Sequence, residues 1–329
     1  MRSSIGVVMI LCSLLVIQFG CSPDAPHDNP LDPGSPNYRN AGNLTGMVLT
    51  LSYPYSGIPN ALVTIRQNGS AQLTTSDGSF AFTDAPAGSL SVIVSKPSYM
   101  SDTLNFTLPV GGSYDATLHL DALPVVTNPQ VVTTKIDQWW PGPVYYATVT
   151  ANVMDPDGIG DIVDSTVKVQ VDSLSFLMNY SGGSGTFQAT INATQLPGQD
   201  LQWLVGKGVF VEARDRENGS TIQGPFYVSR IIESEPTTTY PANSDTTSAS
   251  PRFEWSPPPV SFNYTYSLQV FLVNAGTPSE VGNPIILGPD SVAYSYPDSL
   301  APGQYFWTIG ITDSYGNSSR SKEAAFIVP

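Results

Sequence analysis

The chain contains very little cysteine and histidine, with two of each among its 329 residues. Cys12 lies in an apolar N-terminal run, so removal of that run would leave one cysteine and exclude an internal disulfide or a cysteine-ligated metal site. The histidines are His27 and His119, and no Ser-His-Asp set, H-E-x-x-H motif or C-x-x-C motif can be recognised. We therefore predict that the protein is not an enzyme, although two carboxylates that meet in space would leave hydrolysis open.

Positive charge is also scarce, because 13 Lys and Arg stand against 27 Asp and Glu and give a formal net charge of −14. Such an acidic surface repels nucleic acid and anionic lipid headgroups, so we expect neither as a ligand. Only 12% of the residues are charged, whereas the chain has 28 Gly and 29 Pro and is 41% hydrophobic. This composition is typical of secreted all-β domains with many turns, and we expect no helix after the N-terminal run.

The N-terminus has the pattern of a secretory leader. Arg2 precedes an apolar run over residues 5–19, which ends in Gly20 and Cys21. A positive residue, about 15 apolar residues and a small residue at the cut are the parts of a signal peptide, and the run is too short for a spanning helix. We therefore predict a signal peptide over residues 1–20.

Cys21, directly after the small residue, resembles the lipobox of bacterial lipoproteins, although Gln18 stands where that family prefers Leu. The resemblance implies that cleavage leaves Cys21 as a lipidated N-terminus. It also implies that the lipid anchors the protein to a membrane of the bacterial cell envelope, for which we expect the outer membrane. An ordinary cleaved signal with a leftover thiol is the alternative.

Residues 21–42 are rich in proline and acidic residues and contain almost no apolar ones. Proline at this density favours extended polyproline II structure. We expect a semi-rigid tether that holds the first domain away from the membrane.

Residues 43–121 are predicted to form short strands separated by turns, with alternating burial in segments such as 61–66 and 90–94. Ser76-Asp77-Gly78 predicts a tight hairpin turn. The segment also carries a series of ordered motifs: Gly46-Met47-Val48, Gly57-Ile58-Pro59-Asn60-Ala61, Thr75-Ser76-Asp77-Gly78-Ser79-Phe80, Pro86-Ala87-Gly88 and Pro97-Ser98-Tyr99. They resemble the carboxypeptidase regulatory-like domain, a transthyretin-like β-sandwich, except that Ser98 replaces a usual Gly. The resemblance implies a non-catalytic module.

Two further strand-rich segments follow. Residues 122–233 look like bacterial immunoglobulin-like or cadherin-like sandwiches, in which a polar D-P-D-G turn follows an early strand. Residues 234–329 resemble a fibronectin type III domain through an early Trp255, a Pro-Gly turn before an aromatic strand, and the Asp313-x-x-Gly-Asn317 turn. Because Phe253 and Trp255 alternate with polar residues, we expect both to face the core.

The strongest metal candidate is the loop that contains Asp155, Asp157 and Asp161. Carboxylates at alternate positions around a Gly turn suit Ca²⁺, which prefers oxygen ligands. The spacing does not match an EF-hand loop, and a solvated turn without metal is the alternative. We expect Ca²⁺ to bind here at millimolar affinity or not at all, and we expect no other cofactor.

Trp139, Trp140 and Tyr145 form an aromatic cluster in a predicted loop. Exposed flat rings are suited to stacking on sugars. The alternative interpretation is that one Trp ring lies in the core and the other shields a seam between domains.

The sequence thus predicts an all-β protein with three tandem immunoglobulin-like β-sandwich domains behind a lipoprotein signal peptide and a Pro-rich tether. The function that fits best is that of a non-enzymatic rod of the cell envelope with a structural, adhesive or partner-binding role. The alternatives are a surface glycan-binding lipoprotein that assists polysaccharide uptake, and an accessory subunit of an outer-membrane machine. The envelope protein or polysaccharide partner is not identified by the sequence.

Overall fold

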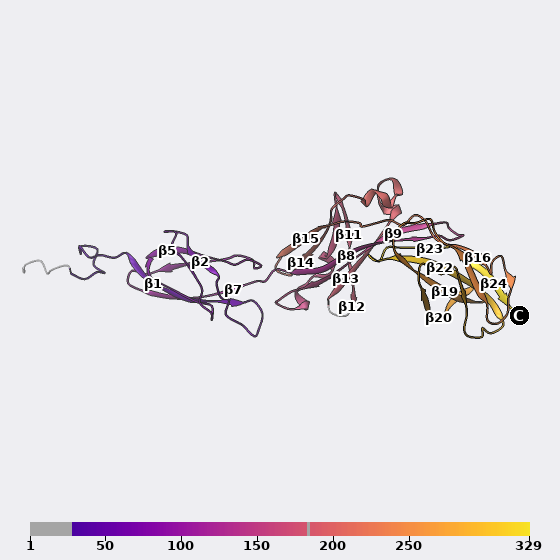
Figure 1. Cartoon of the computed structure of the whole chain (residues 1–329). Helices are drawn as coiled ribbons and strands as arrows, with labels where there is room; N and C mark the ends of the chain where they lie inside the picture. Colours follow the sequence, from indigo (N-terminus) through magenta and orange to yellow (C-terminus); the bar gives the residue numbers. More distant parts are fainter. Residues whose placement is uncertain (1–27, 183–184) are drawn as a thin grey trace, which may run out of the picture. The chain divides into compact units, whose positions relative to one another are not determined.

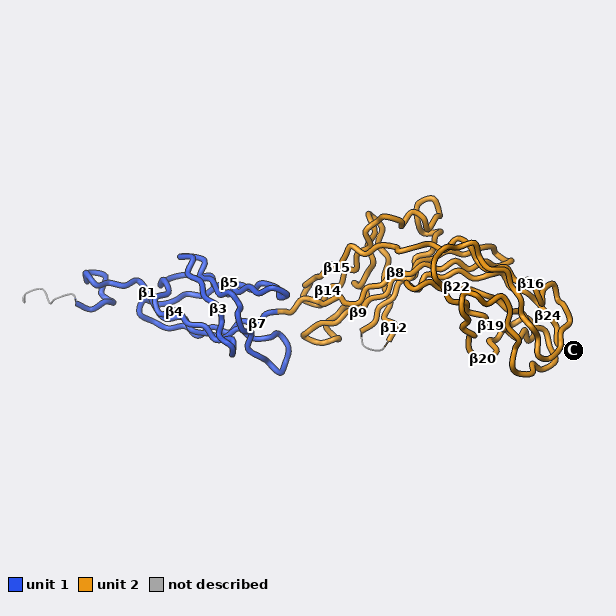
Figure 2. The backbone as a smooth tube through the Cα atoms, in the orientation of Figure 1, with its two compact units in different colours: residues 1–120 blue, residues 121–329 orange. Residues whose placement is uncertain are grey.

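The computed structural model describes residues 28–182 and 185–329. The predicted signal peptide over residues 1–20 and the predicted lipidation site Cys21 lie outside the described residues. Within them the chain forms β-strands, turns and short 3₁₀ segments but no α-helix, which confirms the all-β class (Figure 1). In this part of the chain no helix has the length and apolarity needed to cross a bilayer. The chain divides into two compact units, Met1–Leu120 and Asp121–Pro329 (Figure 2).

The first unit is a β-sandwich of two sheets. One sheet has the order β4-β1-β7, with β1 and β7 parallel, and the other has the order β3-β2-β5-β6. The strands are β1 (Ala41–Thr50), β2 (Leu62–Ile65), β3 (Ala71–Leu73), β4 (Ser79–Pro86), β5 (Gly88–Ser95), β6 (Asp102–Leu108) and β7 (Ser113–Leu120).

The core of the first unit follows the period-two alternation of its strands. Leu90, Val92 and Val94 of β5 are buried, while the residues between them are only partly so. Gly46 lets β1 approach its neighbours closely, because a Cβ on this residue would lie 2.2 Å from the carbonyl oxygen of Ala116. Strand β6 was not among the predicted strands, although its Leu104, Phe106 and Leu108 alternate with polar residues and pack against the core.

Two local predictions for the first unit are wrong. Residues 28–40 form successive hydrogen-bonded turns rather than extended polyproline II, since the side chains of Asn29 and Asp32 accept hydrogen bonds from backbone N–H groups two residues later. The Ser76-Asp77-Gly78 turn does form, but it joins β3 to β4, which belong to different sheets. It is therefore a connection between sheets and not a hairpin.

The second unit begins with the middle sandwich, whose strands are β8 (Val125–Ile136), β9 (Val144–Met154), β10 (Lys168–Val171), β11 (Leu174–Leu177), β12 (Asn179–Gly182), β13 (Thr186–Asn192), β14 (Val209–Arg214) and β15 (Ser220–Phe226). Short 3₁₀ segments lie at Ile159–Asp161, Asp164–Thr166, Ala193–Gln195, Pro197–Gln199 and Leu201–Leu204. The sheet β11-β10-β14-β15 packs against the strands β12-β13-β9-β8 around a core of Val, Ala and Leu side chains with Phe187 fully buried.

The third sandwich contains β16 (Thr237–Tyr240), β17 (Asp245–Thr246), β18 (Arg252–Ser256), β19 (Tyr264–Asn274), β20 (Thr277–Leu287), β21 (Ala293–Ser295), β22 (Gly303–Asp313), β23 (Ser318–Arg320) and β24 (Ala324–Val328). Its core is aromatic: Phe253, Trp255 and Trp307 are all buried. The Trp307 indole N–H donates to the carbonyl of Pro241 at 2.8 Å, which satisfies its one polar atom. The prediction that Phe253 and Trp255 face the core is confirmed.

The middle and third sandwiches share one ten-stranded sheet. β23 pairs in parallel with β8, with Ser318 opposite Thr134 and Arg320 opposite Ile136. The backbone N–H of Asp137 continues the ladder by donating to the carbonyl of Arg320 at 2.9 Å. The sequence predicts two separate modules here, whereas main-chain hydrogen bonds join the two sandwiches.

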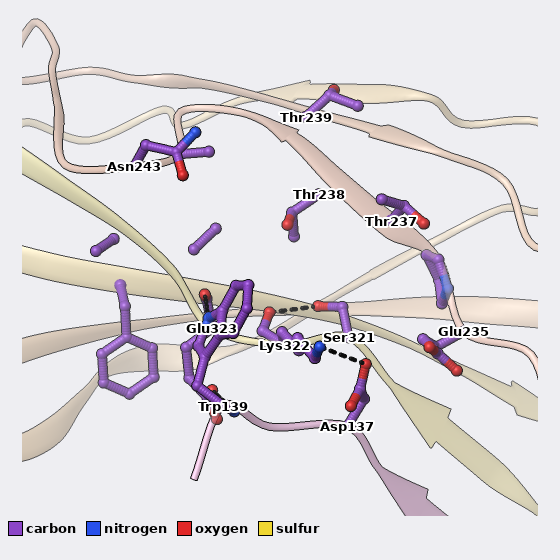
Figure 3. Close-up of a pocket in the computed structure, with 15 residues that line it drawn as sticks. Asp137, Trp139, Glu235, Thr237, Thr238, Thr239, Asn243, Ser321, Lys322 and Glu323 are labelled. Atoms are coloured by element: carbon purple, nitrogen blue, oxygen red, sulfur yellow. Dashed lines mark hydrogen bonds and ion pairs between the residues drawn. The ribbon is translucent and has the colours of Figure 1, made fainter. Parts of the chain in front are cut away.

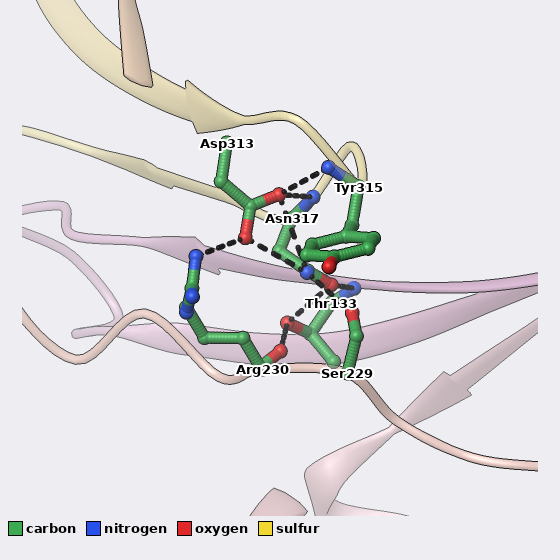
Figure 4. A network of polar contacts seen from close by, with 6 residues as sticks. All are labelled: Thr133, Ser229, Arg230, Asp313, Tyr315 and Asn317. Carbon is green, nitrogen blue, oxygen red and sulfur yellow. Dashed lines mark hydrogen bonds and ion pairs between the residues drawn. The ribbon is translucent and has the colours of Figure 1, made fainter. Parts of the chain in front are cut away.

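A buried polar network reinforces this junction (Figure 4). Asn317 is fully buried, and its Oδ1 accepts the backbone N–H of Thr133 at 3.0 Å while its amide donates to Ser229 Oγ at 2.9 Å. Asp313 accepts the Asn317 N–H at 3.0 Å and pairs with Arg230 at 2.8 Å. The predicted Asp-x-x-Gly-Asn turn therefore does more than end a strand, because its side chains hold the two sandwiches together.

Candidate functional site

The loop predicted to bind Ca²⁺ is part of a larger group of carboxylates in the middle sandwich. The side chains that lie close together are Asp121, Asp157, Asp161, Asp215 and Glu217, which we call the acidic cluster. Oxygen atoms of Asp121, Asp157 and Asp161 all lie within 4.8 Å of one another, and the same holds for Asp121, Asp215 and Glu217. Asp121 thus belongs to both triplets and lies at the centre of the cluster.

The predicted ligand Asp155 has a different position from the other two. It belongs to neither triplet, and its Oδ1 accepts the backbone N–H of Asp157 at 2.8 Å. Asp157 in turn accepts the N–H of Ala122 at 2.8 Å. Asp155 therefore fixes the backbone of Asp157 by a hydrogen bond. Asp157 in turn connects its loop to the segment that contains Asp121.

Several carboxylate oxygens at the cluster are buried without a hydrogen-bond partner. Asp121 is 7% exposed, and neither of its side-chain oxygens has a partner among the described residues. Asp155 and Asp215 are 7% and 2% exposed, and in each the Oδ2 atom is unpartnered. Buried charged groups are ordinarily paired or bound to metal, so this arrangement is costly unless a cation compensates it.

The electrostatics of the cluster reflect this crowding. Burial, with the negative charges of Asp215 and Glu217 next in importance, raises the pKa of Asp121 to about 7. Burial likewise raises the pKa of Asp155 to about 6 and also raises the pKa of Asp215. Burial therefore opposes the ionisation of Asp121, Asp155 and Asp215.

Sequence reasoning missed Asp121, Asp215 and Glu217 because they are distant in the chain from the D-P-D-G loop. An isolated bridge between Ile162 and Asp215 brings the two loops together. A signal was present, however: Asp215 and Glu217 precede Gly219 in a turn after an apolar strand, which is the same pattern that singled out the first loop.

A groove of about 630 Å³ lies along the seam between the middle and third sandwiches (Figure 3). The residues that line it include Asp137, Trp139, Glu235, Thr237, Thr238, Thr239, Asn243, Phe306, Lys322 and Glu323. The Trp139 indole N–H donates to the carbonyl of Glu323 at 2.8 Å, and Lys322 Nζ lies 4.5 Å from the centre of the Trp139 ring. Trp139 is thus fixed in place while 70% of it remains exposed.

The other two aromatic candidates lie elsewhere. Trp140 is 84% exposed and does not line the groove. Tyr145 is half-buried in β9, packs against the middle core and lies beneath Lys135 Nζ. The interpretation that one Trp lies in the core is wrong, because both Trp residues precede β9 in a loop where strand alternation does not apply. The idea that one ring covers a seam fits Trp139.

His119 shows no arrangement for catalysis. Its Nδ1 lies 2.9 Å from the carbonyl oxygen of Thr50, and its ring packs on Tyr55 in the first unit. This environment is that of a half-buried structural side chain. His27 lies outside the described residues.

Comparison with known families supports the assignment of the first sandwich. A carboxypeptidase regulatory-like domain is found at residues 43–121. The recognition of this domain from its motifs is confirmed. A search of curated proteins gave no match.

Solved structures align with the chain at low similarity. The major pilin subunit BcpA of Bacillus cereus is 10% identical, with 84% of this chain and 91% of the pilin covered and a TM-score of 0.30. Fibronectin(III)-like modules of CbhA from Clostridium thermocellum are 11% identical over 63% of this chain and 93% of theirs, with a TM-score of 0.29. A DUF3823 family protein from Bacteroides ovatus is 11% identical over 57% and 97%, with a TM-score of 0.26. Likeness at this level carries no argument about function.

Proposed function

We propose that the protein is a non-enzymatic, membrane-anchored lipoprotein of the bacterial cell envelope with a structural or adhesive role. The lipid on Cys21 provides the anchor. The partner binds to the second unit. This unit consists of an immunoglobulin-like or cadherin-like middle sandwich and a fibronectin type III-like third sandwich. The observation that carries the proposal is the sheet that these two sandwiches share through β8 and β23.

A shared sheet suits a part that transmits load between an anchor and a partner. Independent sandwiches joined by a flexible linker can bend at the linker. Here main-chain hydrogen bonds, together with the buried contacts of Asn317 and Asp313, must break before the two sandwiches separate. Buried networks of this kind hold one arrangement because each broken bond leaves an unpaired group behind.

The proposal is tested in cells that produce the full chain. Cross-linking of intact cells is expected to join the wild-type protein to a defined envelope protein, and deletion of the gene is expected to weaken attachment or envelope integrity. Asn317→Ala, which cuts the junction between the sandwiches, should reduce both effects, whereas Asn263→Ala at an exposed position should not. A phenotype that is unchanged in the deletion strain would contradict a structural role.

Glycan capture is the second candidate, and the exposure of Trp139 and Trp140 favours it. Flat exposed rings next to a groove with Thr hydroxyls and carboxylates offer both stacking and hydrogen bonds to a sugar. The partner of this surface would be a polysaccharide.

Affinity electrophoresis of the full chain in gels that contain polysaccharide tests this second candidate. Retardation of the wild type that is lost in Trp139→Ala and Trp140→Ala would support capture. Tyr53→Ala is the control, because Tyr53 is equally exposed but belongs to the first unit. Migration that is the same for all variants in every polysaccharide would exclude it.

A further inference from the structure

We propose that the acidic cluster is a calcium site built around Asp121, with ligands from three separate loops of the second unit. The site differs from the weak one expected from the sequence, because Asp121, Asp215 and Glu217 join Asp157 and Asp161. This inference does not depend on the proposed function.

The unpartnered oxygens of Asp121 carry the argument. Asp121 is more than nine-tenths buried and belongs to both triplets of the cluster, and neither of its carboxylate oxygens has a donor among the described residues. A buried carboxylate without a partner costs several kcal/mol in general, and proteins retain such groups where a cation binds. Among the described residues, Asp121, Asp155 and Asp215 form no ion pair with Lys, Arg or His that would compensate their charge.

Two carboxylates of the cluster, Asp157 and Asp215, are held in place by backbone donors. Asp215 Oδ1 accepts the Gly219 N–H at 2.6 Å, which leaves its Oδ2 unpartnered. Asp157 is held by the N–H of Ala122 and supported by Asp155. Backbone N–H groups thus orient both carboxylates, and ligands that are oriented in this way bind metal more tightly than free ones.

Gly219 leaves room for this arrangement. A Cβ on Gly219 would lie 2.2 Å from Asp215 Oδ2, so any other residue would displace the oxygen that has no partner. The glycine has no positive φ that would require it for backbone reasons. Its close approach to Asp215 is made by the turn, in which the Asp215 N–H donates to the Gly219 carbonyl at 3.0 Å.

The donor set selects the ion. All the ligands are carboxylate oxygens, which suit hard cations and do not favour zinc or copper. Ca²⁺ accepts six to eight oxygens in irregular geometry, whereas Mg²⁺ requires a tight octahedron and usually keeps several waters. Four carboxylates around the buried Asp121 side chain, five in all, fit Ca²⁺ better than Mg²⁺.

Binding would couple the ion to the stability of the middle sandwich. Asp121 precedes β8, Asp157 and Asp161 follow β9, and Asp215 and Glu217 follow β14. An ion held by all three segments would tie together strands from both sheets of that sandwich.

The test uses the purified full-length chain, freed of metal with EDTA and then dialysed, at pH 8. Calorimetric titration with CaCl₂ is expected to give a dissociation constant below about 0.1 mM. In 5 mM CaCl₂ the unfolding transition of the second unit should rise by about 5 °C or more. Asp121→Asn and Asp215→Asn should each weaken binding about tenfold or more, with the matched control Asp164→Asn, an exposed residue of the same loop region, within about twofold.

A second measurement separates loss of the site from loss of the fold. Without calcium, Asp121→Asn should melt at or above the temperature of the wild type, because the substitution removes a buried charge that lacks a partner. With calcium the order should reverse. Titration without heat and without a thermal shift up to 5 mM CaCl₂, or wild-type affinity in Asp121→Asn, would overturn the site. Equal affinity for MgCl₂ would overturn its assignment to calcium.

Discussion

Asn317 and Thr133 are 184 positions apart in the chain, yet the Thr133 backbone N–H donates to Asn317 Oδ1 at 3.0 Å. The Thr133 hydroxyl also donates to the same oxygen at 3.2 Å. Thr133 belongs to β8 of the middle sandwich, and Asn317 precedes β23 of the third. This contact lies next to the only parallel pairing observed between the described strands of the two sandwiches, so it locks the register of the sheet they share.

Asn317→Ala is expected to destabilise the second unit by about 2 to 4 kcal/mol, because it leaves the buried backbone N–H of Thr133 without its acceptor and removes the hydrogen bonds of the Asn317 amide to Ser229 and Asp313. Urea unfolding followed by tryptophan fluorescence measures the change. Asn263→Ala, at an exposed position, should change the free energy of unfolding by less than about 0.5 kcal/mol. Equal stability of the two variants would show that the network does not support the junction.

Trp255→Ala and Trp140→Ala form a matched pair that tests the assignment of core and surface. Trp255 is 3% exposed and its ring packs on Tyr266 with centroids 5.3 Å apart, so its loss should cost about 3 to 5 kcal/mol. Trp140 is 84% exposed, and its loss should cost less than about 0.5 kcal/mol. Differential scanning calorimetry of the full chain compares them. A Trp255→Ala variant that melts like the wild type would place the ring outside the core.

Gly46→Ala should destabilise the first unit alone. The added Cβ would lie 2.2 Å from the carbonyl oxygen of Ala116 and 2.7 Å from the Phe80 ring, so β1 must move, at a cost of about 1 to 3 kcal/mol. Gly288→Ala, where a Cβ meets nothing within 4 Å, is the control. Hydrogen exchange resolved by segment should show faster exchange in β1, β4 and β7. Unchanged exchange in these strands would contradict the prediction, because it would mean that they accommodate the added methyl group without a steric clash.

Cys21 is expected to carry the lipid. Intact mass of the membrane-extracted protein should correspond to a chain that begins at Cys21 with acyl groups attached, because Leu11 is too large to precede a cut at Cys12. Cys21→Ser should release the protein from the membrane fraction. Membrane attachment that survives this substitution would contradict lipid anchoring.

Much of the fold was predictable because local patterns determine it. The alternation around Trp255 and the ordered motifs of residues 43–121 identify a core strand and a domain from neighbouring residues alone. The turns at residues 28–40 differ from the extended structure that the proline density predicts, because the side chains of Asn29 and Asp32 accept backbone N–H groups there. The preference of proline for extended structure and these side-chain hydrogen bonds are both local effects. In this segment the hydrogen bonds determine the conformation.

The candidate site was predictable only in part, for a different reason. Asp157 and Asp161 stand out in one loop, but Asp121 and Asp215 join them only through the packing of strands distant in the chain. The pairing of β8 with β23 could not be predicted either. Strand β23 is short and polar, so its sequence has no hydrophobic pattern that would indicate which strand it pairs with. Local sequence identifies candidate ligands and strands, and the tertiary fold decides which of them meet.

The central claim is that the two sandwiches of the second unit behave as one cooperative body. Hydrogen exchange of the full chain with Trp255→Ala tests it most directly, because the substitution weakens only the core of the third sandwich. The account predicts that amides of β8 and β9 in the middle sandwich lose protection together with those of β22 and β23. Wild-type exchange in β8 and β9, with loss of protection confined to the strands of the third sandwich, would contradict it.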